Sequence, residues 1–239
     1  MSIDIGKPVI VLFRHDLRIA DNRAFYAASR SEKPVIPVFL WDEETSSDIR
    51  PIGGARRWWL HHSLAALAAS LRGPGATLVL RRGKTKAIVN ALIEETGADM
   101  VLWNRRYDPP GFGIDGRLRQ ELARQGVGAE DFEGQLLHEP SVLKTSTGGY
   151  YRVYTPFWRA INAGPEPRDP IPAPEKIKVW HREIPSQKLE DWALLPKKPD
   201  WAGHFSKVWT PGEHGAHERL EAFLDDAVGQ YPSDRDRPS

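Results

Sequence analysis

The chain has 239 residues, of which 33 are basic and 32 acidic, so its formal charge at neutral pH is +1. A balance this even excludes the strongly basic tails and histone-like proteins that bind polyanions through charge alone. The sequence contains no cysteine, which excludes disulfide scaffolds, thiolate metal sites, iron–sulfur ligation and a cysteine nucleophile, and favours a cytoplasmic location. No apolar run approaches the ~18 residues of a membrane span, and no signal peptide opens the chain. We therefore expect a protein that is neither membrane-bound nor exported.

Residues 8–132 alternate short apolar runs with longer amphipathic runs, a pattern typical of βαβ units around a mostly parallel sheet. Five runs predict strands, the last more weakly than the others: 9–13, 35–41, 77–80, 100–103 and 127–132. Pro37 lies inside the second run, and because proline cannot donate to a sheet ladder, we expect a bulge or a locally unpaired edge there. The predicted fold class is α/β, with a five-stranded, mostly parallel, doubly wound sheet of the Rossmann-like kind.

Helices are predicted between these strands. Over residues 55–71 four leucines recur at spacings of four, three and four, at Leu60, Leu64, Leu67 and Leu71. This spacing places one apolar stripe on a helix and assigns the stripe to the core. Two more helices are predicted at 85–96 and 115–125, since each of these segments ends before a glycine.

After Phe132 the alternating pattern stops. Residues 164–200 hold 8 of the 20 prolines, which predicts a connector without regular structure. Large aromatic residues are rare in disordered segments, so we expect other parts of the protein to cover Trp180, Trp192, Trp201 and Trp209. A short helix is predicted at 155–161 and a last helix at about 213–228.

Arginine is frequent at the predicted carboxyl ends of the strands. The first strand leads into FRHDLR at 13–18, the third into RRGK at 81–84 and the fourth into WNRRYD at 103–108. In an open α/β sheet the ligand lies at these ends, so one interpretation is a cleft for a flat anionic ligand, held by guanidinium groups and aromatic rings. The alternative is a set of solvated loop charges neutralised by Asp16, Asp42 and Asp108.

Several familiar motifs are excluded. The first βα turn has no glycine, so it cannot bring its backbone against a pyrophosphate as a GxGxxG turn does. Gly83, Lys84 and Thr85 end like a P-loop, but the upstream glycine is missing. His214 and His217 do not have the spacing of HExxH, and no GxSxG elbow surrounds a serine. We predict no metal site and no catalytic residue in this chain.

Five strings, taken in order, resemble the DNA photolyase and cryptochrome family. They are FRHDLR at 13–18 with Asp21 and Asn22; GGARRWWL at 53–60 with HSL at 62–64; Trp103, Asn104 and Tyr107; YRVYTPF at 151–157; and Pro211, Gly212 and Glu213 followed by Arg219, Leu220, Phe223, Tyr231, Arg235, Asp236 and Pro238.

The resemblance implies a light-driven flavoenzyme. In this family reduced FAD, excited directly or through an antenna pigment, donates an electron to a cyclobutane pyrimidine dimer that has flipped out of UV-damaged DNA, and the electron later returns. The α/β domain carries the antenna pigment, and a helical domain carries FAD and the DNA cleft. We therefore expect an antenna domain at 1–132, an interdomain connector at 133–212 and the entry of the FAD-binding domain at 213–239. We also expect the chain to end before most of that domain and to be inactive in repair by itself.

The resemblance assigns few site residues. Tyr231 matches a position that contacts FAD, and Arg235 matches one that contacts DNA phosphate. Folate-binding members use an Asn–Glu pair where this chain has Pro110 and Gly111. The antenna therefore stays undecided between a deazaflavin, a folate in another pose and no pigment.

By position alone, the candidates for the antenna cleft are Arg14, Asp16, Asn104 and Arg105. Three alternatives remain open at this point: a stand-alone module that binds a nucleotide or pterin, a fragment that complements a separately encoded helical domain, and a cryptochrome-type photoreceptor.

Overall fold

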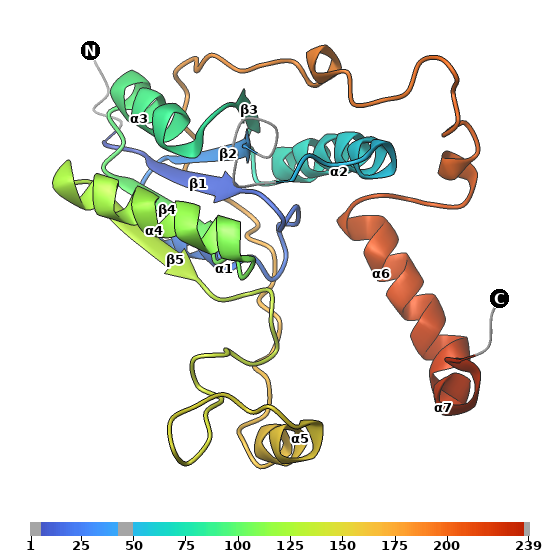
Figure 1. Cartoon of the computed structure of the whole chain (residues 1–239). Coiled ribbons are helices and arrows are strands. Elements are labelled where there is room, and N and C mark those ends of the chain that lie inside the picture. Colours follow the sequence, from blue (N-terminus) through green and yellow to red (C-terminus); the bar gives the residue numbers. More distant parts are fainter. Residues whose placement is uncertain (1–5, 43–49, 237–239) are drawn as a thin grey trace.

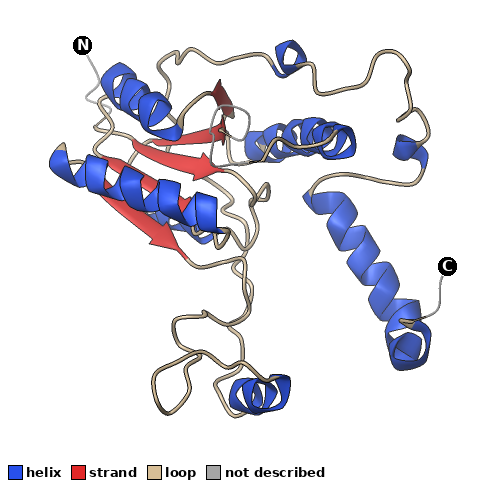
Figure 2. Ribbon diagram, in the orientation of Figure 1, coloured by secondary structure: helices blue, strands red, loops and turns tan. Residues whose placement is uncertain are grey.

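The structure is a computed structural model that describes residues 6–42 and 50–236. Its centre is a five-stranded sheet in the order β3-β2-β1-β4-β5, and every paired strand runs parallel to its neighbour. The strands are β1 (Val9–Phe13), β2 (Val35–Trp41), β3 (Val79–Arg82), β4 (Met100–Asn104) and β5 (Gly128–Phe132). The chain moves outward from β1 to β3 and then returns across β1 to β4 and β5, so the strand order reverses beside β1 (Figures 1 and 2). The predicted α/β class is confirmed.

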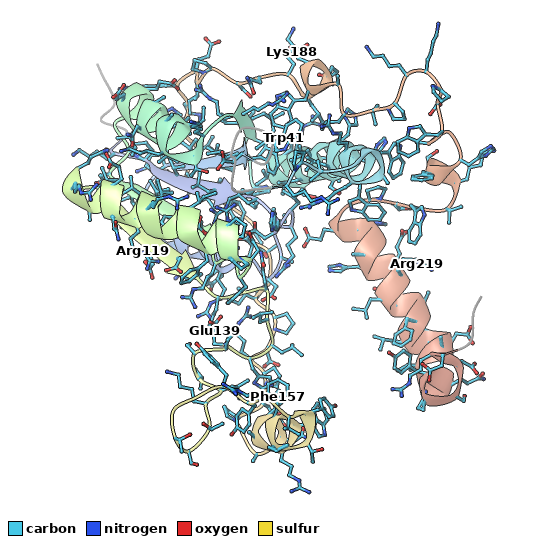
Figure 3. All side chains as sticks on the ribbon, viewed as in Figure 1. Trp41, Arg119, Glu139, Phe157, Lys188 and Arg219 are labelled. Carbon is cyan, nitrogen blue, oxygen red and sulfur yellow. The ribbon has the colours of Figure 1, made fainter. Side chains whose placement is uncertain are left out.

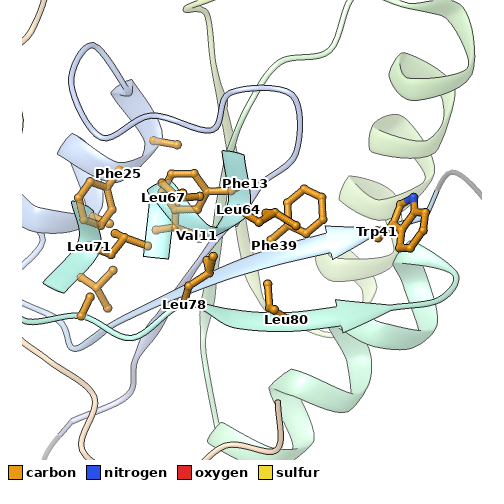
Figure 4. Close-up of a cluster of buried hydrophobic side chains, with 14 of the residues drawn as sticks. Val11, Phe13, Phe25, Phe39, Trp41, Leu64, Leu67, Leu71, Leu78 and Leu80 are labelled. Atoms are coloured by element: carbon orange, nitrogen blue, oxygen red, sulfur yellow. The ribbon is translucent and has the colours of Figure 1, made fainter. Parts of the chain in front are cut away.

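Helices cover both faces of the sheet. The side chains of Val9, Val11 and Phe13 point to the face covered by α1 (Arg23–Arg30) and α2 (Gly54–Arg72), whereas Ile10 and Leu12 point to the face covered by α3 (Thr85–Thr96) and α4 (Pro109–Arg124). Alternate residues of a strand face opposite sides, which is why one apolar run supplies both cores. Leu64, Leu67 and Leu71 are buried in the first core, as their spacing predicts (Figure 4). Leu60 packs partly buried against it.

Three local expectations are corrected. The third strand begins at Val79 rather than residue 77, so Arg81 and Arg82 belong to the strand itself. Helix α4 begins at Pro109, six residues before the predicted start, because the Asp108 carboxylate accepts the Gly111 N–H and caps a first turn in which two prolines need no N–H partner. Helix α1 lies in a segment for which no helix was predicted; Asn22 caps it by accepting the Phe25 N–H.

Pro37 causes no bulge. It pairs in regular register with Val11 of β1, while the ladder between β2 and β3 begins only at Val38. The expected unpaired edge is therefore found on the β3 side, where a missing N–H costs nothing.

The connector packs partly against the sheet. Lys178 O accepts the Val35 N–H, and Ser186 Oγ accepts the Leu80 N–H, so residues 178–187 follow the β2 and β3 edge. Further along, Trp192 is only 5% exposed, and its ring lies 5.2 Å from that of Trp41. The expectation that the tryptophans are covered thus holds fully for Trp192, whereas Trp201 is 43% exposed and its ring lies 5.5 Å from that of Phe205.

Apart from the turn Leu189–Trp192, whose Trp192 belongs to the first core, the remaining helical segments contribute no residue to the two cores described above. The connector forms α5 (Tyr154–Asn162) in a lobe below the sheet, and the short 3-10 turns Leu189–Trp192 and Phe205–Lys207. Helix α6 (Glu213–Ala222) starts beside α2 and leads away from the sheet through the turns Phe223–Ala227 and Val228–Gln230 into α7 (Tyr231–Asp234) (Figure 1). None of the helices in the described ranges is long and apolar enough to cross a bilayer.

Candidate functional site

A cavity of about 410 Å³ opens at the carboxyl ends of β1 and β2. Its floor comes from these strand ends, one wall from α2 and another from the first turns of α6. Aromatic rings of Phe39, Trp41 and Trp59 line it; Trp41 marks the end of β2 in Figure 3. Such a mixture of flat rings and convergent polar groups is typical of small-molecule sites at the switch point of an α/β sheet.

The charges around this cavity favour an anion. Among the described lining residues, guanidinium groups outnumber carboxylates, with Arg14, Arg18, Arg56 and Arg106 against Asp42 and Glu213. The Asp42 carboxylate already accepts the Thr85 hydroxyl at 2.7 Å. Guanidinium groups recognise carboxylates and phosphates through paired hydrogen bonds, so this lining suits a ligand that carries either group.

Arg14 belongs to a buried ion network under the cavity. Asp115 Oδ1 accepts hydrogen bonds from Arg14 Nη1 at 2.5 Å and from Arg106 Nη2 at 2.7 Å, and Asn104 O accepts Arg14 Nη2 at 3.0 Å. Burial lowers the pKa of the Arg14 guanidinium, and the neighbouring Asp115 carboxylate opposes that shift. The Asp115 charge thus allows two guanidinium groups to stay together at the cavity floor.

Two donors on lining residues are left without partners. Arg14 Nε and Trp41 Nε1 are buried and have no hydrogen-bond partner among the described residues. Buried polar groups are normally satisfied. Each of these atoms has almost no accessible surface, so both lie beneath the cavity lining and do not face the open cavity.

Asp16 and Asn104 were predicted in the cleft, but the structure places them beside it. Asn104 Nδ2 donates to Asp16 Oδ2 at 2.6 Å and to Asn22 Oδ1 at 2.8 Å, and its Oδ1 accepts the Ala24 N–H at 3.1 Å. Both side chains are almost fully buried. Their bonds therefore fasten the loop after β1 and the start of α1 to the end of β4.

Arg105 does not line the cavity. It forms ion pairs with Asp131 at 2.7 Å and with Glu139 at 2.8 Å, beside β5 and the loop that leads to the α5 lobe (Figure 3). Glu139 also accepts the Tyr107 hydroxyl. Burial, followed by this hydrogen bond, raises the pKa of Tyr107 to about 12. Arg14 is thus the predicted cleft residue that lines the described part of the cavity.

Tyr231 and Arg235 lie at the far end of the chain from this cavity. The Tyr231 ring is 51% exposed and meets Phe223 edge-on at 5.8 Å. Arg235 Nε lies 3.6 Å from Asp236, and both side chains are largely exposed. Neither residue lines the cavity described above.

Several lining residues were not predicted. Arg56 and Trp59 belong to α2, and Glu213 and His217 to α6. A signal did exist for α2, because Arg56, Trp59 and Ser63 recur at spacings of three and four and share a helix face beside the leucine stripe. No local signal relates the α6 residues to the strand ends.

Comparisons with known proteins agree with this architecture. A family model described as DNA photolyase matches residues 9–175. The chain is 52% identical over 235 residues to a deoxyribodipyrimidine photo-lyase of Agrobacterium fabrum, covering 97% of this chain and 48% of that protein. It is 31% identical over 231 residues to cryptochrome-1 of Arabidopsis thaliana, covering 95% of this chain and 33% of that protein.

The same relationship is visible in three dimensions. The structure matches the crystal structure of a bacterial class III photolyase from Agrobacterium tumefaciens with a TM-score of 0.92 and 51% identity, covering 98% of this chain and 48% of that one. The chain spans about half the length of the photo-lyase relatives it matches. Since the family model covers well over half of the residues, the chain belongs to the DNA photolyase family.

Proposed function

We propose that this chain is the antenna-binding α/β half of a DNA photolyase, and that the antenna pigment occupies the cavity at the carboxyl ends of β1 and β2. The observation that carries this proposal is the lining itself: aromatic rings beside a surplus of guanidinium groups. A flat ring system would lie against Trp41 and Trp59, and a carboxylate or phosphate would meet Arg14, Arg56 or Arg106.

The pigment class is a flat chromophore with an anionic group, a description that fits both a deazaflavin and a folate. A folate held by the Asn–Glu pair of some relatives is not supported. Pro110 and Gly111 stand in those places, and both are taken up by the first turn of α4, where the Gly111 N–H bonds to Asp108. A folate would therefore need a different pose.

We further propose that the complete protein repairs pyrimidine dimers in UV-damaged DNA. Reduced FAD, when bound, supplies the light-driven electron; this chain contributes Tyr231 toward FAD and Arg235 toward DNA phosphate. A second, helical half is supported by an apolar row along α6, the two turns after it and α7, where four side chains are 44–53% exposed at helical spacing: Leu220, Leu224, Val228 and Tyr231. On this proposal residues 1–132 form the antenna domain, 133–212 the connector and 213–239 the entry to the helical half, and the chain alone repairs no DNA.

Pigment titration tests the antenna proposal. The purified chain is titrated separately with an 8-hydroxy-5-deazaflavin and with a methenyltetrahydrofolate, and binding is followed by the polarisation of pigment fluorescence. We expect one of them to bind with a dissociation constant of about 10 μM or tighter, roughly 7 kcal/mol. Trp59→Ala should weaken binding about fivefold, the effect of losing about 1 kcal/mol of ring contact.

Trp158→Ala is the matched control. Trp158 is 48% exposed, compared with 42% for Trp59, but lies in α5, far from the cavity (Figure 1). Binding of neither pigment, or equal affinities of the two variants, would contradict the proposed site. Repair of an irradiated oligonucleotide by this chain alone under illumination would contradict the division of labour between the two halves.

A further inference from the structure

We infer that Glu213 is a positioning residue that clamps α6 over the cavity, so that pigment retention and the docking of α6 are energetically coupled. This inference rests on the proposed antenna function of the same cavity. Glu213 would exert this effect by holding α6 in place, without touching the pigment.

The clamp consists of two hydrogen bonds to one carboxylate. Glu213 Oε2 accepts the Ile19 N–H and Oε1 accepts the Ala20 N–H, both at 2.9 Å. These consecutive amides lie in the loop between β1 and α1, more than 190 residues away in the chain. Both carboxylate oxygens are used, and hydrogen bonds to an ionised acceptor are stronger than those between neutral groups.

The two clamped segments both line the cavity. Leu17 and Arg18 come from the loop after β1, and Gly212, Ala216 and His217 come from the start of α6. The clamp therefore joins these two parts of the lining directly, whereas the start of α6 otherwise packs against α2. Loss of the clamp would free α6 to move away and would open the cavity to solvent.

The segment before α6 packs closely against α2, which places Glu213 next to the Ile19 and Ala20 amides. Gly212 has φ +111°, and a Cβ at this position would lie 2.6 Å from Ala66 Cβ of α2. Just before it, the rings of Trp209 and Trp59 meet edge-on at 5.8 Å. The beginning of α6 is thus held closely, whereas exposed apolar side chains follow further along, Leu220 on α6 and Leu224 in the turn after it.

This arrangement makes the first turn of α6 the place where the helix is attached to the α/β domain. A pigment that touches both parts of the lining stabilises the closed arrangement, and by thermodynamic reciprocity the closed arrangement retains the pigment. Bound pigment should therefore protect the Ile19 and Ala20 amides from exchange with solvent, and weakening the clamp should shorten the lifetime of the bound pigment.

Hydrogen exchange of residues 17–23 and pigment dissociation rates test this coupling in the chain, in Glu213→Gln and in Glu221→Gln. Glutamine keeps one acceptor but turns an NH2 donor toward the second amide. Glu221, an exposed residue of the same helix, controls for the change in charge. The probe is whichever of the deazaflavin and the folate binds the unmodified chain.

In the unmodified chain and in Glu221→Gln, we expect saturating pigment to slow exchange at Ile19 and Ala20. In Glu213→Gln, exchange at these amides should rise about tenfold or more without pigment, and the pigment should dissociate about tenfold faster, the order expected for losing a hydrogen bond to a charged group. The melting temperature should stay close to that of the control, because the clamp fastens one helix and not the core.

The inference is overturned if the pigment binds the unmodified chain but leaves exchange at Ile19 and Ala20 unchanged, a comparison that needs no variant to fold. It is also overturned if Glu213→Gln retains the pigment as long as Glu221→Gln does. Failure of the unmodified chain to bind either pigment would instead refute the proposed function itself, and the coupling with it.

Discussion

Asp115→Ala removes the carboxylate that holds two guanidinium groups together beneath the cavity. In the folded chain Asp115 accepts hydrogen bonds from Arg14 and Arg106, and the two arginine side chains are each only 4% exposed. After the substitution these like charges would face each other without the carboxylate between them. Removing one partner of a buried ion pair costs about 3–5 kcal/mol, because the remaining charge stays buried and uncompensated.

We expect the lower part of that range, about 3 kcal/mol. Each arginine keeps one backbone acceptor, Asn104 O at 3.0 Å for Arg14 and Gly111 O at 3.3 Å for Arg106. Urea unfolding, followed by tryptophan fluorescence and circular dichroism, measures this loss as a lower midpoint at unchanged slope. Adding Arg106→Met to Asp115→Ala should recover part of the stability, because it removes one of the two buried charges.

Asp99→Ala is the control for Asp115→Ala, because it removes an ion pair that lies near the surface. Asp99 pairs with Lys33 at 2.5 Å, but both side chains are about one third exposed. Exposed pairs contribute about 0–1 kcal/mol and are screened by salt. The effect of Asp99→Ala should therefore be small and should fade in about 1 M salt, whereas that of Asp115→Ala should persist. If Asp115→Ala costs less than about 1 kcal/mol, or fades with salt like the control, the buried network does not support the cavity floor as described.

Three more outcomes follow from the structure. The tyrosinate absorbance of Tyr107, taken as the difference between the unmodified chain and Tyr107→Phe, should titrate near pH 12 instead of 10, and a midpoint at 10 would contradict the bond to Glu139. Because the pKa is raised in the folded state, the stabilising contribution of this hydroxyl should be complete below pH 10 and disappear as the pH rises through about 12. Trp192→Ala should lower the free energy of unfolding by about 3–5 kcal/mol in urea, because it empties a buried site against the sheet; an unchanged midpoint would show that the connector does not belong to the core. Gly212→Ala should cost more than about 1 kcal/mol because of its positive φ, whereas Gly229→Ala, with open space around it, should be nearly neutral; equal thermal stability of the two would contradict the close fit of α6 to α2.

Much of the fold can be predicted from the sequence because the relevant signals are local. Strand runs 9–13 and 35–41 and the helix 85–96 coincide with β1, β2 and α3, since apolar periodicity and the glycine after a helix act within a few residues. Local reasoning failed where the signal was shorter or mixed. Helix α1 has only eight residues, and α4 opens with two prolines and a glycine that predict a turn in isolation.

The residues of the functional site, too, fall into those that sequence position predicts and those that it does not. Position after β1 was enough to select Arg14, because the carboxyl ends of parallel strands form one edge whatever the details of packing. Position could not reveal that Asp16 and Asn104 satisfy each other under the surface or that Arg105 pairs with Asp131 and Glu139. Those outcomes depend on which acceptor lies within hydrogen-bond distance once the strands are in register.

The sequence by itself therefore determined the α/β class, the strand edge that bears the cavity and, through its motifs, the family. Only the tertiary structure decided what closes that cavity. Trp59 reaches the strand ends from an intervening helix. Glu213 reaches the loop after β1 from more than 190 residues further along the chain, and no local signal in the sequence relates it to that loop. Hydrophobic periodicity arises between residues a few positions apart, whereas a wall built from distant segments exists only after the core has brought those segments together and their amides and carboxylates can meet.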